Sequence, residues 1–88
     1  LNSEYIVKLD TTARVIRRTG WSLNFRASSP DGTNITLTTT FYYGSNVIAS
    51  WNDSLGASLT FIKHDLTSAE IQNLPTDGAN FKIGFKIS

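Results

Sequence analysis

The feature that most constrains the fold of this chain is an alternation of apolar and polar residues with a period of two. The clearest example is 81–87, where Phe and Ile alternate with Lys and Gly. Residues 21–26 show the same pattern, with Trp21, Leu23 and Phe25 at alternate positions. Successive side chains of a strand point to opposite faces, so each run predicts a strand with one buried face. The pattern therefore favours a β protein.

Further strands are expected at several places, separated by turn signals. They are expected over 5–9, 13–18, 35–43, 47–51 and 59–62. The strongest turn signal is Pro30-Asp31-Gly32, because Pro presets φ and Gly tolerates a positive φ. A hairpin is expected at 44–46 and another turn at 52–56. Roughly seven short strands with regular turns are typical of an antiparallel sandwich.

One helical signal interrupts the strands. The segment Thr67-Ser68-Ala69-Glu70 matches a capping box, in which the first and fourth residues bond each other's backbone amides. Ile71 and Leu74 are expected to face the core, and Pro75 ends the helical turn. We therefore predict that residues 1–88 form one all-β domain. Its expected architecture is an antiparallel immunoglobulin-like β-sandwich with one short helical turn before the last strand.

The residue counts argue against most chemistry. The 88 residues contain no Cys and a single His, which excludes disulfides, thiolate metal sites and multi-His sites. His64 and Asp65 are neighbours that would point to opposite faces of a strand, so we interpret His64 as part of a solvated strand end. The acidic residues, Asp53 among them, fall mostly in expected turns or caps. No phosphate-binding loop or nucleophile motif is present. We expect no enzyme, no cofactor and no metal.

Charge and hydropathy also limit the partners. The net charge is only +1, and Arg17 and Arg18 would leave a strand on opposite faces, which dilutes any basic patch. We therefore expect no nucleic-acid partner. The favoured role of these arginines is a polar strand edge protected against aggregation, or salt bridges to a neighbouring subunit. No uncharged apolar stretch approaches the roughly 20 residues that a membrane span needs, so no membrane partner is expected. The chain has no Met and begins with Leu1, and we expect it to be a piece of a longer product.

The aromatic residues leave two interpretations open. Trp21, Trp51 and the pair Tyr42-Tyr43 are candidates for a platform on which a sugar stacks. Trp21 also belongs to a core pattern, and one of the two adjacent tyrosines must face inward. An exposed aromatic side chain is equally suited to anchor a protein interface. The residues nominated for contact with a partner are Arg17, Arg18, Tyr43 and Trp51.

Two stretches carry a resemblance to a known family. Residues 31–38 read Asp-Gly-Thr-Asn-Ile-Thr-Leu-Thr, and residues 66–75 read Leu-Thr-Ser-Ala-Glu-Ile-Gln-Asn-Leu-Pro. They resemble the "D-G-x-x-I-x-L-T" and "L-T-x-x-E-x-x-x-L-P-x-G" stretches of small immunoglobulin-like domains of tailed bacteriophages, such as the N-terminal domain of baseplate upper proteins. The resemblance spans roughly residues 5–87. This chain departs from it by an extended segment over 14–18 and by Thr76-Asp77 before Gly78.

The resemblance implies a structural role in a virion. Such domains dock onto a capsid or a tail or baseplate assembly, as capsid decoration, head-fibre or fibre-attachment modules. The expected partners are other virion proteins, the expected state in the assembly is a homo-oligomer, and the expected contact is edge-strand pairing or packing of a sheet face. The alternative is a carbohydrate-binding β-sandwich module that recognises a cell-surface glycan through exposed aromatic residues.

Overall fold

The fold of this chain is known from a computed structural model, which describes residues 4–8, 21–74 and 80–88. The described part contains strands and one short helix. In chain order these are β1 (Tyr5–Lys8), β2 (Ser22–Ala27), β3 (Ile35–Tyr43), β4 (Asn46–Leu55), β5 (Thr60–Asp65), α1 (Ser68–Gln72) and β6 (Phe81–Ile87). The predicted all-β class is confirmed, with the helical turn directly before the last strand. The strand expected over 13–18 lies outside the described residues.

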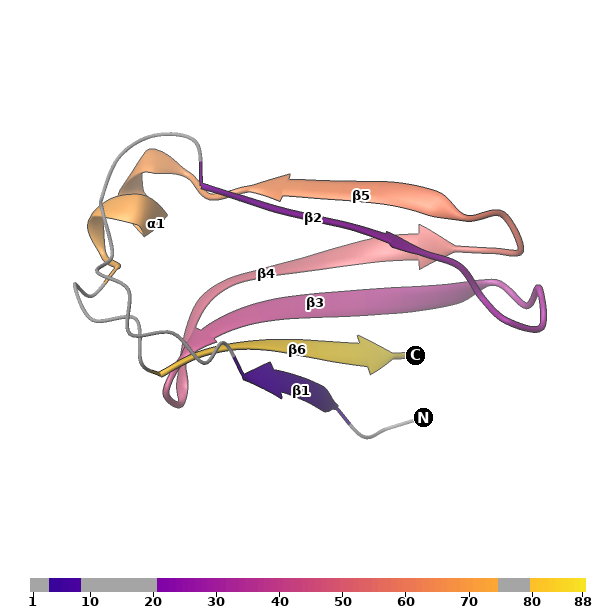
Figure 1. Ribbon diagram of the computed structural model, residues 1–88, viewed down its shortest axis with the longest axis horizontal. Coiled ribbons are helices and arrows are strands. Elements are labelled where there is room, and N and C mark those ends of the chain that lie inside the picture. Colours follow the sequence, from indigo (N-terminus) through magenta and orange to yellow (C-terminus); the bar gives the residue numbers. More distant parts are fainter. Residues whose placement is uncertain (1–3, 9–20, 75–79) are drawn as a thin grey trace.

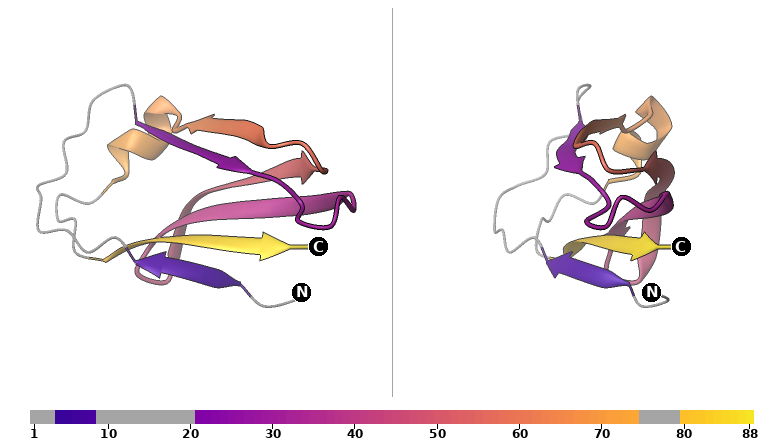
Figure 2. Two further views of the ribbon diagram at one scale, coloured as in Figure 1. Left: turned by 45° about the vertical axis from the view of Figure 1, so that its right-hand side comes forward. Right: turned by 90° about the vertical axis from the view of Figure 1, so that its right-hand side faces the viewer.

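The strands form two antiparallel sheets. The larger sheet has the order β1-β6-β3-β4, and the smaller one pairs β2 with β5. Figure 1 shows the smaller sheet beside β4, whereas β1 lies farthest from it, and the end-on view in Figure 2 shows the same two layers. Constant-type immunoglobulin domains distribute seven strands over two sheets. The 4+2 arrangement here is a two-layer β fold, and the finer immunoglobulin-like assignment stays a prediction.

The core lies between the two sheets. Two buried clusters fill it, one of Phe41, Ile71, Leu74, Phe81 and Ile83 and the other of Leu37, Leu55 and Ile62. The ring of Phe25 on β2 meets the ring of Phe85 on β6 edge-on, with centroids 5.5 Å apart. Side chains of both sheets thus interdigitate, and the last strand, which lies between β1 and β3, supplies much of the inner face.

The capping box that the sequence predicts is present at α1. The Thr67 side chain accepts a hydrogen bond from the Glu70 amide (3.2 Å), and the Glu70 carboxylate accepts one from the Thr67 amide (2.8 Å). Ile71 and Leu74 are buried, as expected, and close one end of the core. α1 is too short to hold itself together in water, so this packing is what stabilises it.

The turns agree with the sequence at two places and differ at a third. Gly32 and Gly44 have φ values of +78° and +61°, as the predicted turn and hairpin require. The turn expected at 52–56 is wrong, because β4 continues to Leu55. Its polar residues belong to a strand with a polar outer face: Asn52 points outward and accepts a hydrogen bond from Thr38 (2.7 Å).

Candidate functional site

The nominated contact residues lie in different settings. Arg17 and Arg18 are outside the described residues. Tyr43 is half-buried on the inner face, where its ring meets Phe81 edge-on with centroids 5.3 Å apart. Trp51 is also half-buried and packs against the main core cluster. Both aromatic side chains are therefore partly covered by the core, and their nomination as contact residues stays a prediction.

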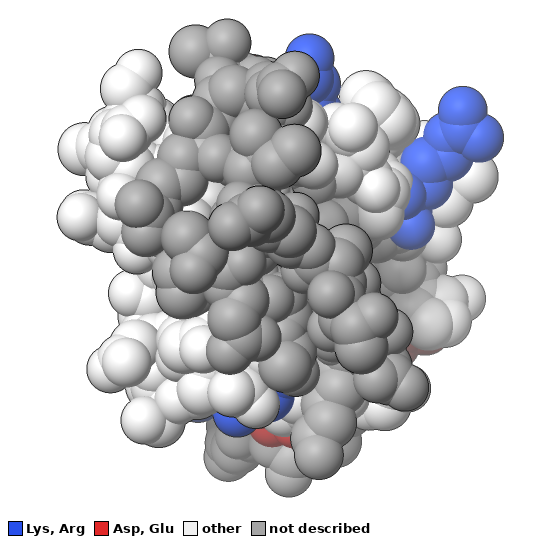
Figure 3. Space-filling model, turned by 60° about the vertical axis from the view of Figure 1, so that its left-hand side comes forward, with Lys and Arg blue, Asp and Glu red and all other residues white. Residues whose placement is uncertain are grey.

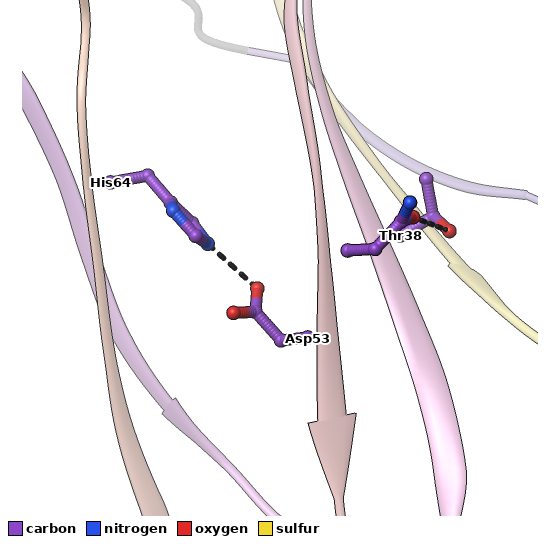
Figure 4. Close-up of polar contacts among 4 residues, drawn as sticks. Thr38, Asp53 and His64 are labelled. Carbon is purple, nitrogen blue, oxygen red and sulfur yellow. Dashed lines mark hydrogen bonds and ion pairs between the residues drawn. The ribbon is translucent and has the colours of Figure 1, made fainter.

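His64 is not part of a solvated strand end. Its Nε2 lies 2.7 Å from Oδ2 of Asp53, and the exposed fractions of the two side chains are 17% and 23%. Figure 4 shows the two side chains pointing toward each other, His64 from β5 and Asp53 from β4. The partner of His64 is Asp53 on β4 and not its sequence neighbour Asp65. A contact between two strands of this kind cannot be inferred from residues that are adjacent in the sequence.

The His64–Asp53 pair joins the two sheets. An ionised carboxylate only accepts hydrogen bonds, so Nε2 of His64 donates to Asp53. The His64 ring also stacks on Trp51, with centroids 4.7 Å apart and an angle of 2° between the planes. Trp51 and Asp53 both lie on β4, the edge strand of the larger sheet. Since an inward-pointing charge on an edge strand disfavours pairing with foreign strands, Asp53 protects this edge as well.

Ser22, on the strand that pairs with the strand of His64, bonds a side chain of its own strand. Ser22 lies on β2 and its Oγ donates to Oδ1 of Asn24 (3.0 Å). Within 4–8, 21–74 and 80–88, no cluster of three or more His, Cys, Asp or Glu side chains is arranged to hold a metal ion. The contact between His64 and Asp53 links β5 to β4.

A partly enclosed apolar cavity lies beside the Trp51–His64 stack. Its volume is about 130 Å³. The apolar side chains that line it are Trp21, Leu23, Phe41, Trp51, Leu66 and Ile83. Ser22 and His64 supply the polar part of the lining. The walls come from both sheets, so the cavity lies between them and is open on part of its surface.

Exposed apolar side chains lie on the outer face of the smaller sheet and directly before β5. Leu59 and Phe61 have exposed fractions of 66% and 59%. Arg26 is the register partner of Phe61 across the sheet, and Lys63 lies two residues further along β5, also exposed. We call Arg26, Leu59, Phe61 and Lys63 the Phe61 patch. The signal for it was in the sequence: Phe61 and Ile62 are adjacent in a strand, so one of them had to point away from the core.

The central part of the outer face of the larger sheet is polar and internally bonded, whereas the exposed Val47 lies on the same face near the start of β4. Thr38 donates to Asn52, and the hydroxyls of Thr40 and Ser50 lie 3.1 Å apart. These are cross-strand pairs between β3 and β4. Because the polar groups satisfy each other, this face offers few unpaired donors or acceptors to a ligand.

On the same outer face, Tyr42 ties β1 to the sheet. Its hydroxyl donates to the Glu4 carboxylate, whose oxygens lie 2.7 Å and 2.9 Å away. The bond to Glu4 raises the pKa of Tyr42, because the carboxylate accepts from the neutral phenol and repels the phenolate. Gly84 lies below this contact, where a Cβ would collide with Glu4. The Lys82 ammonium lies 5.6 Å from the ring centroid of Tyr42.

Charge is spread thinly over the visible surface. Figure 3 shows one face on which the described residues are mostly uncharged, with a few basic side chains at separate places. None of the described helices is long and apolar enough to cross a membrane. Comparison with known proteins found no matching family model, no matching curated protein and no matching solved structure. The functional argument therefore rests on the residues of the chain itself.

Proposed function

We propose that this chain is a non-enzymatic structural module of a tailed-bacteriophage virion. In this role it docks onto a capsid or a tail or baseplate protein, as capsid decoration, head-fibre or fibre-attachment module, and it is repeated in the assembly as a homo-oligomer. The observation that carries the proposal is the Phe61 patch, in which the side chains of Phe61 on β5 and of Leu59 directly before β5 are largely exposed.

The composition of the Phe61 patch fits a protein partner. Aromatic and Arg side chains are enriched in the buried centres of protein interfaces, and Phe61 and Arg26 lie directly opposite each other. Covering Leu59 and Phe61 removes apolar area from water, which is the main driving force of association. Lys63 and Arg26 are the cationic groups of the patch, so the matching surface is apolar at its centre and carries carboxylates around it.

The arrangement of the elements is compatible with the resemblance to phage domains. The capped turn of α1 precedes the last strand, and the turn at Gly32 precedes β3, in the order in which the family stretches occur. These features support a common fold pattern. The docking role is supported separately, by the Phe61 patch.

The carbohydrate-binding alternative has less support. Stacking against a sugar needs an aromatic ring with an open face. One face of Trp51 is covered by His64, and Tyr43 packs against Phe81. The exposed aromatic rings in the described part are those of Tyr5 and Phe61. Tyr5 lies at the edge of the larger sheet and Phe61 on the smaller one, so they do not form one platform.

The proposal is tested on phage particles produced by the genome that encodes the chain. Mass spectrometry of purified particles should detect peptides of this chain in an amount that matches a symmetric assembly. A genome carrying Phe61→Ser should yield particles depleted of the chain, although the purified variant keeps the circular dichroism spectrum of the wild type. The matched control is Val47→Ser, since Val47 is similarly exposed but lies on β4.

Three results would contradict the proposal. The first is particles without the chain in the wild type, and the second is equal loss in both serine variants. The third is a saturable change of Trp fluorescence on titration with glycans, which would favour the carbohydrate-binding alternative. Light scattering over a hundredfold concentration range gives the solution mass, and a closed oligomer would agree with the assembly role.

A further inference from the structure

We propose that the cavity between the two sheets is a binding site for one uncharged aromatic ring of the size of benzene, toluene or phenol. This inference goes beyond the docking role and does not depend on it, because the Phe61 patch and the cavity lie on opposite faces of the smaller sheet. The cavity is lined by inward-facing residues such as Leu23 and His64, whereas Phe61 points outward.

The size of the cavity selects a single ring. Its volume is about 130 Å³. An apolar cavity of roughly 150 Å³ in another protein stays dry and binds benzene. A space of this size accepts one six-membered ring with a small substituent.

The lining selects an uncharged ligand. Among the described residues, Trp21, Phe41 and Trp51 present aromatic rings, and the aliphatic part of the wall includes Leu23, Leu66 and Ile83. A charged group moved into such a lining loses its hydration without a partner in return, since His64 already donates to Asp53. Aromatic walls also favour an aromatic guest, because edge-to-face and offset contacts add to the burial of apolar area.

The cavity cannot close by a simple shift of its walls. Phe41 and Ile83 are register partners in the larger sheet, and their strands are fixed by ladders of backbone hydrogen bonds. On the other side, Leu23 is the register partner of His64, which is fixed by Trp51 and Asp53. Atoms that line a void lack contacts on one side, so a guest that fills it recovers dispersion energy without much reorganisation.

Intrinsic fluorescence reports directly on this site, because Trp21 and Trp51 are the two tryptophans of the chain and both line the cavity. We would titrate the intact chain with toluene and phenol, and with benzoate as the charged probe of the same size. We expect a saturable change of Trp emission with the neutral rings, with a Kd on the order of 0.1–1 mM for so few contact atoms. Benzoate should bind at least about tenfold more weakly, because its charge must be desolvated.

Two phenylalanine variants separate the cavity from the rest of the surface. Leu23→Phe places a ring in the cavity, and toluene should then cause no saturable change. Val47→Phe adds the same ring at an exposed position of β4 and should leave toluene binding as in the wild type. Circular dichroism checks that both variants are folded. If Leu23→Phe does not fold, Leu66→Phe fills the cavity from another wall and replaces it.

The source of the ring is distinguished by a third probe, N-acetylphenylalanine amide, which presents the ring on a peptide backbone. If it competes with toluene, the cavity accepts an aromatic side chain of a protein; if only the free rings bind, it accepts a small molecule, and both results support the site. A response that does not saturate, equal binding of benzoate, or undiminished toluene binding in the filled variant would overturn the proposal.

Discussion

The outer faces of the two sheets are built in opposite ways. On the larger sheet, Thr38 bonds Asn52 and Tyr42 bonds Glu4, so the polar side chains are paired with one another. At the smaller sheet, Phe61 on β5 and Leu59 directly before it are exposed for 59% and 66% of their surface. Both faces point away from the same core, but they differ in the free energy that a partner gains by covering them.

The difference indicates which face is able to interact. A partner that covers paired polar groups must break or desolvate bonds that are already made, so the net gain is small. A partner that covers exposed apolar side chains removes them from water at little polar cost. The smaller sheet is therefore the face to test for docking. The paired polar part of the larger sheet is expected to stay hydrated.

The largest effect is expected from two equal truncations at different depths. Phe41→Ala removes a buried ring whose plane stacks on Phe81, and it should destabilise the fold by about 3–5 kcal/mol. Such a loss is of the order of the whole stability of a small domain, so the variant should be largely unfolded at 25 °C. Phe61→Ala removes the same atoms from an exposed position and should change the free energy of unfolding by less than about 0.5 kcal/mol.

The measurement is urea denaturation followed by circular dichroism for both variants. The comparison of the two faces predicts that Phe61→Ala loses docking but not stability, whereas Phe41→Ala loses both. If Phe61→Ala were as unstable as Phe41→Ala, Phe61 would be a core residue and the Phe61 patch would not exist as a free surface.

A smaller effect is expected at the contact between the sheets. Asp53→Ala leaves the half-buried Nε2 donor of His64 without its acceptor, and it should destabilise the fold by about 1–2 kcal/mol. Asp65 is the sequence neighbour of His64 but is exposed, so Asp65→Ala should have little effect. Chemical denaturation of the two variants checks this. Equal destabilisation would show that His64 is stabilised by local charge in general and not by Asp53.

The features that the sequence predicted are those encoded locally. The strand over 81–87 follows from alternation, and the capping box follows from two residues three positions apart. Both patterns act within a few residues, so no knowledge of the rest of the chain is needed. The short apolar run at 59–62 contained a further signal, because its adjacent apolar residues cannot all be buried in a two-layer fold.

The features that the sequence did not predict depend on register. The pairing of His64 with Asp53 requires that β4 and β5 approach at one particular offset, and no short pattern encodes this. Residues 52–55 looked like a turn because Asn, Asp and Ser are turn residues. In the fold the same residues alternate between a polar outer face and an inner face, where Asp53 contacts His64. Tertiary pairing has overridden local preference.

Two adjacent threonines give a comparison on a single strand. Thr39 faces inward and is fully buried, and its hydroxyl has no hydrogen-bond partner in the described part of the chain. Thr39→Val replaces that hydroxyl with a methyl group of similar size and should stabilise the fold by about 1 kcal/mol. Thr38→Val removes the bond to Asn52 and should destabilise it by about 0.5 kcal/mol. Thermal unfolding of both variants gives the two signs, and two shifts of the same sign would contradict the assignment of faces.

The smallest effect is a pH dependence on the outer face of the larger sheet. The hydrogen bond to Glu4 raises the pKa of Tyr42. The folded chain therefore favours the neutral, protonated Tyr42 side chain more than the unfolded chain does. A raised pKa in the fold means that this stabilisation is complete below the ordinary Tyr pKa of about 10 and is lost as the pH rises through the folded value. Urea denaturation between pH 8 and about 11.5 should show this loss in the wild type and not in Tyr42→Phe.

Glu4→Gln should return the Tyr42 absorbance titration toward the ordinary value, because the amide accepts a hydrogen bond without repelling the phenolate. An unchanged titration in that variant would mean that Glu4 does not hold β1 through Tyr42, and the paired polar face would then end at β6.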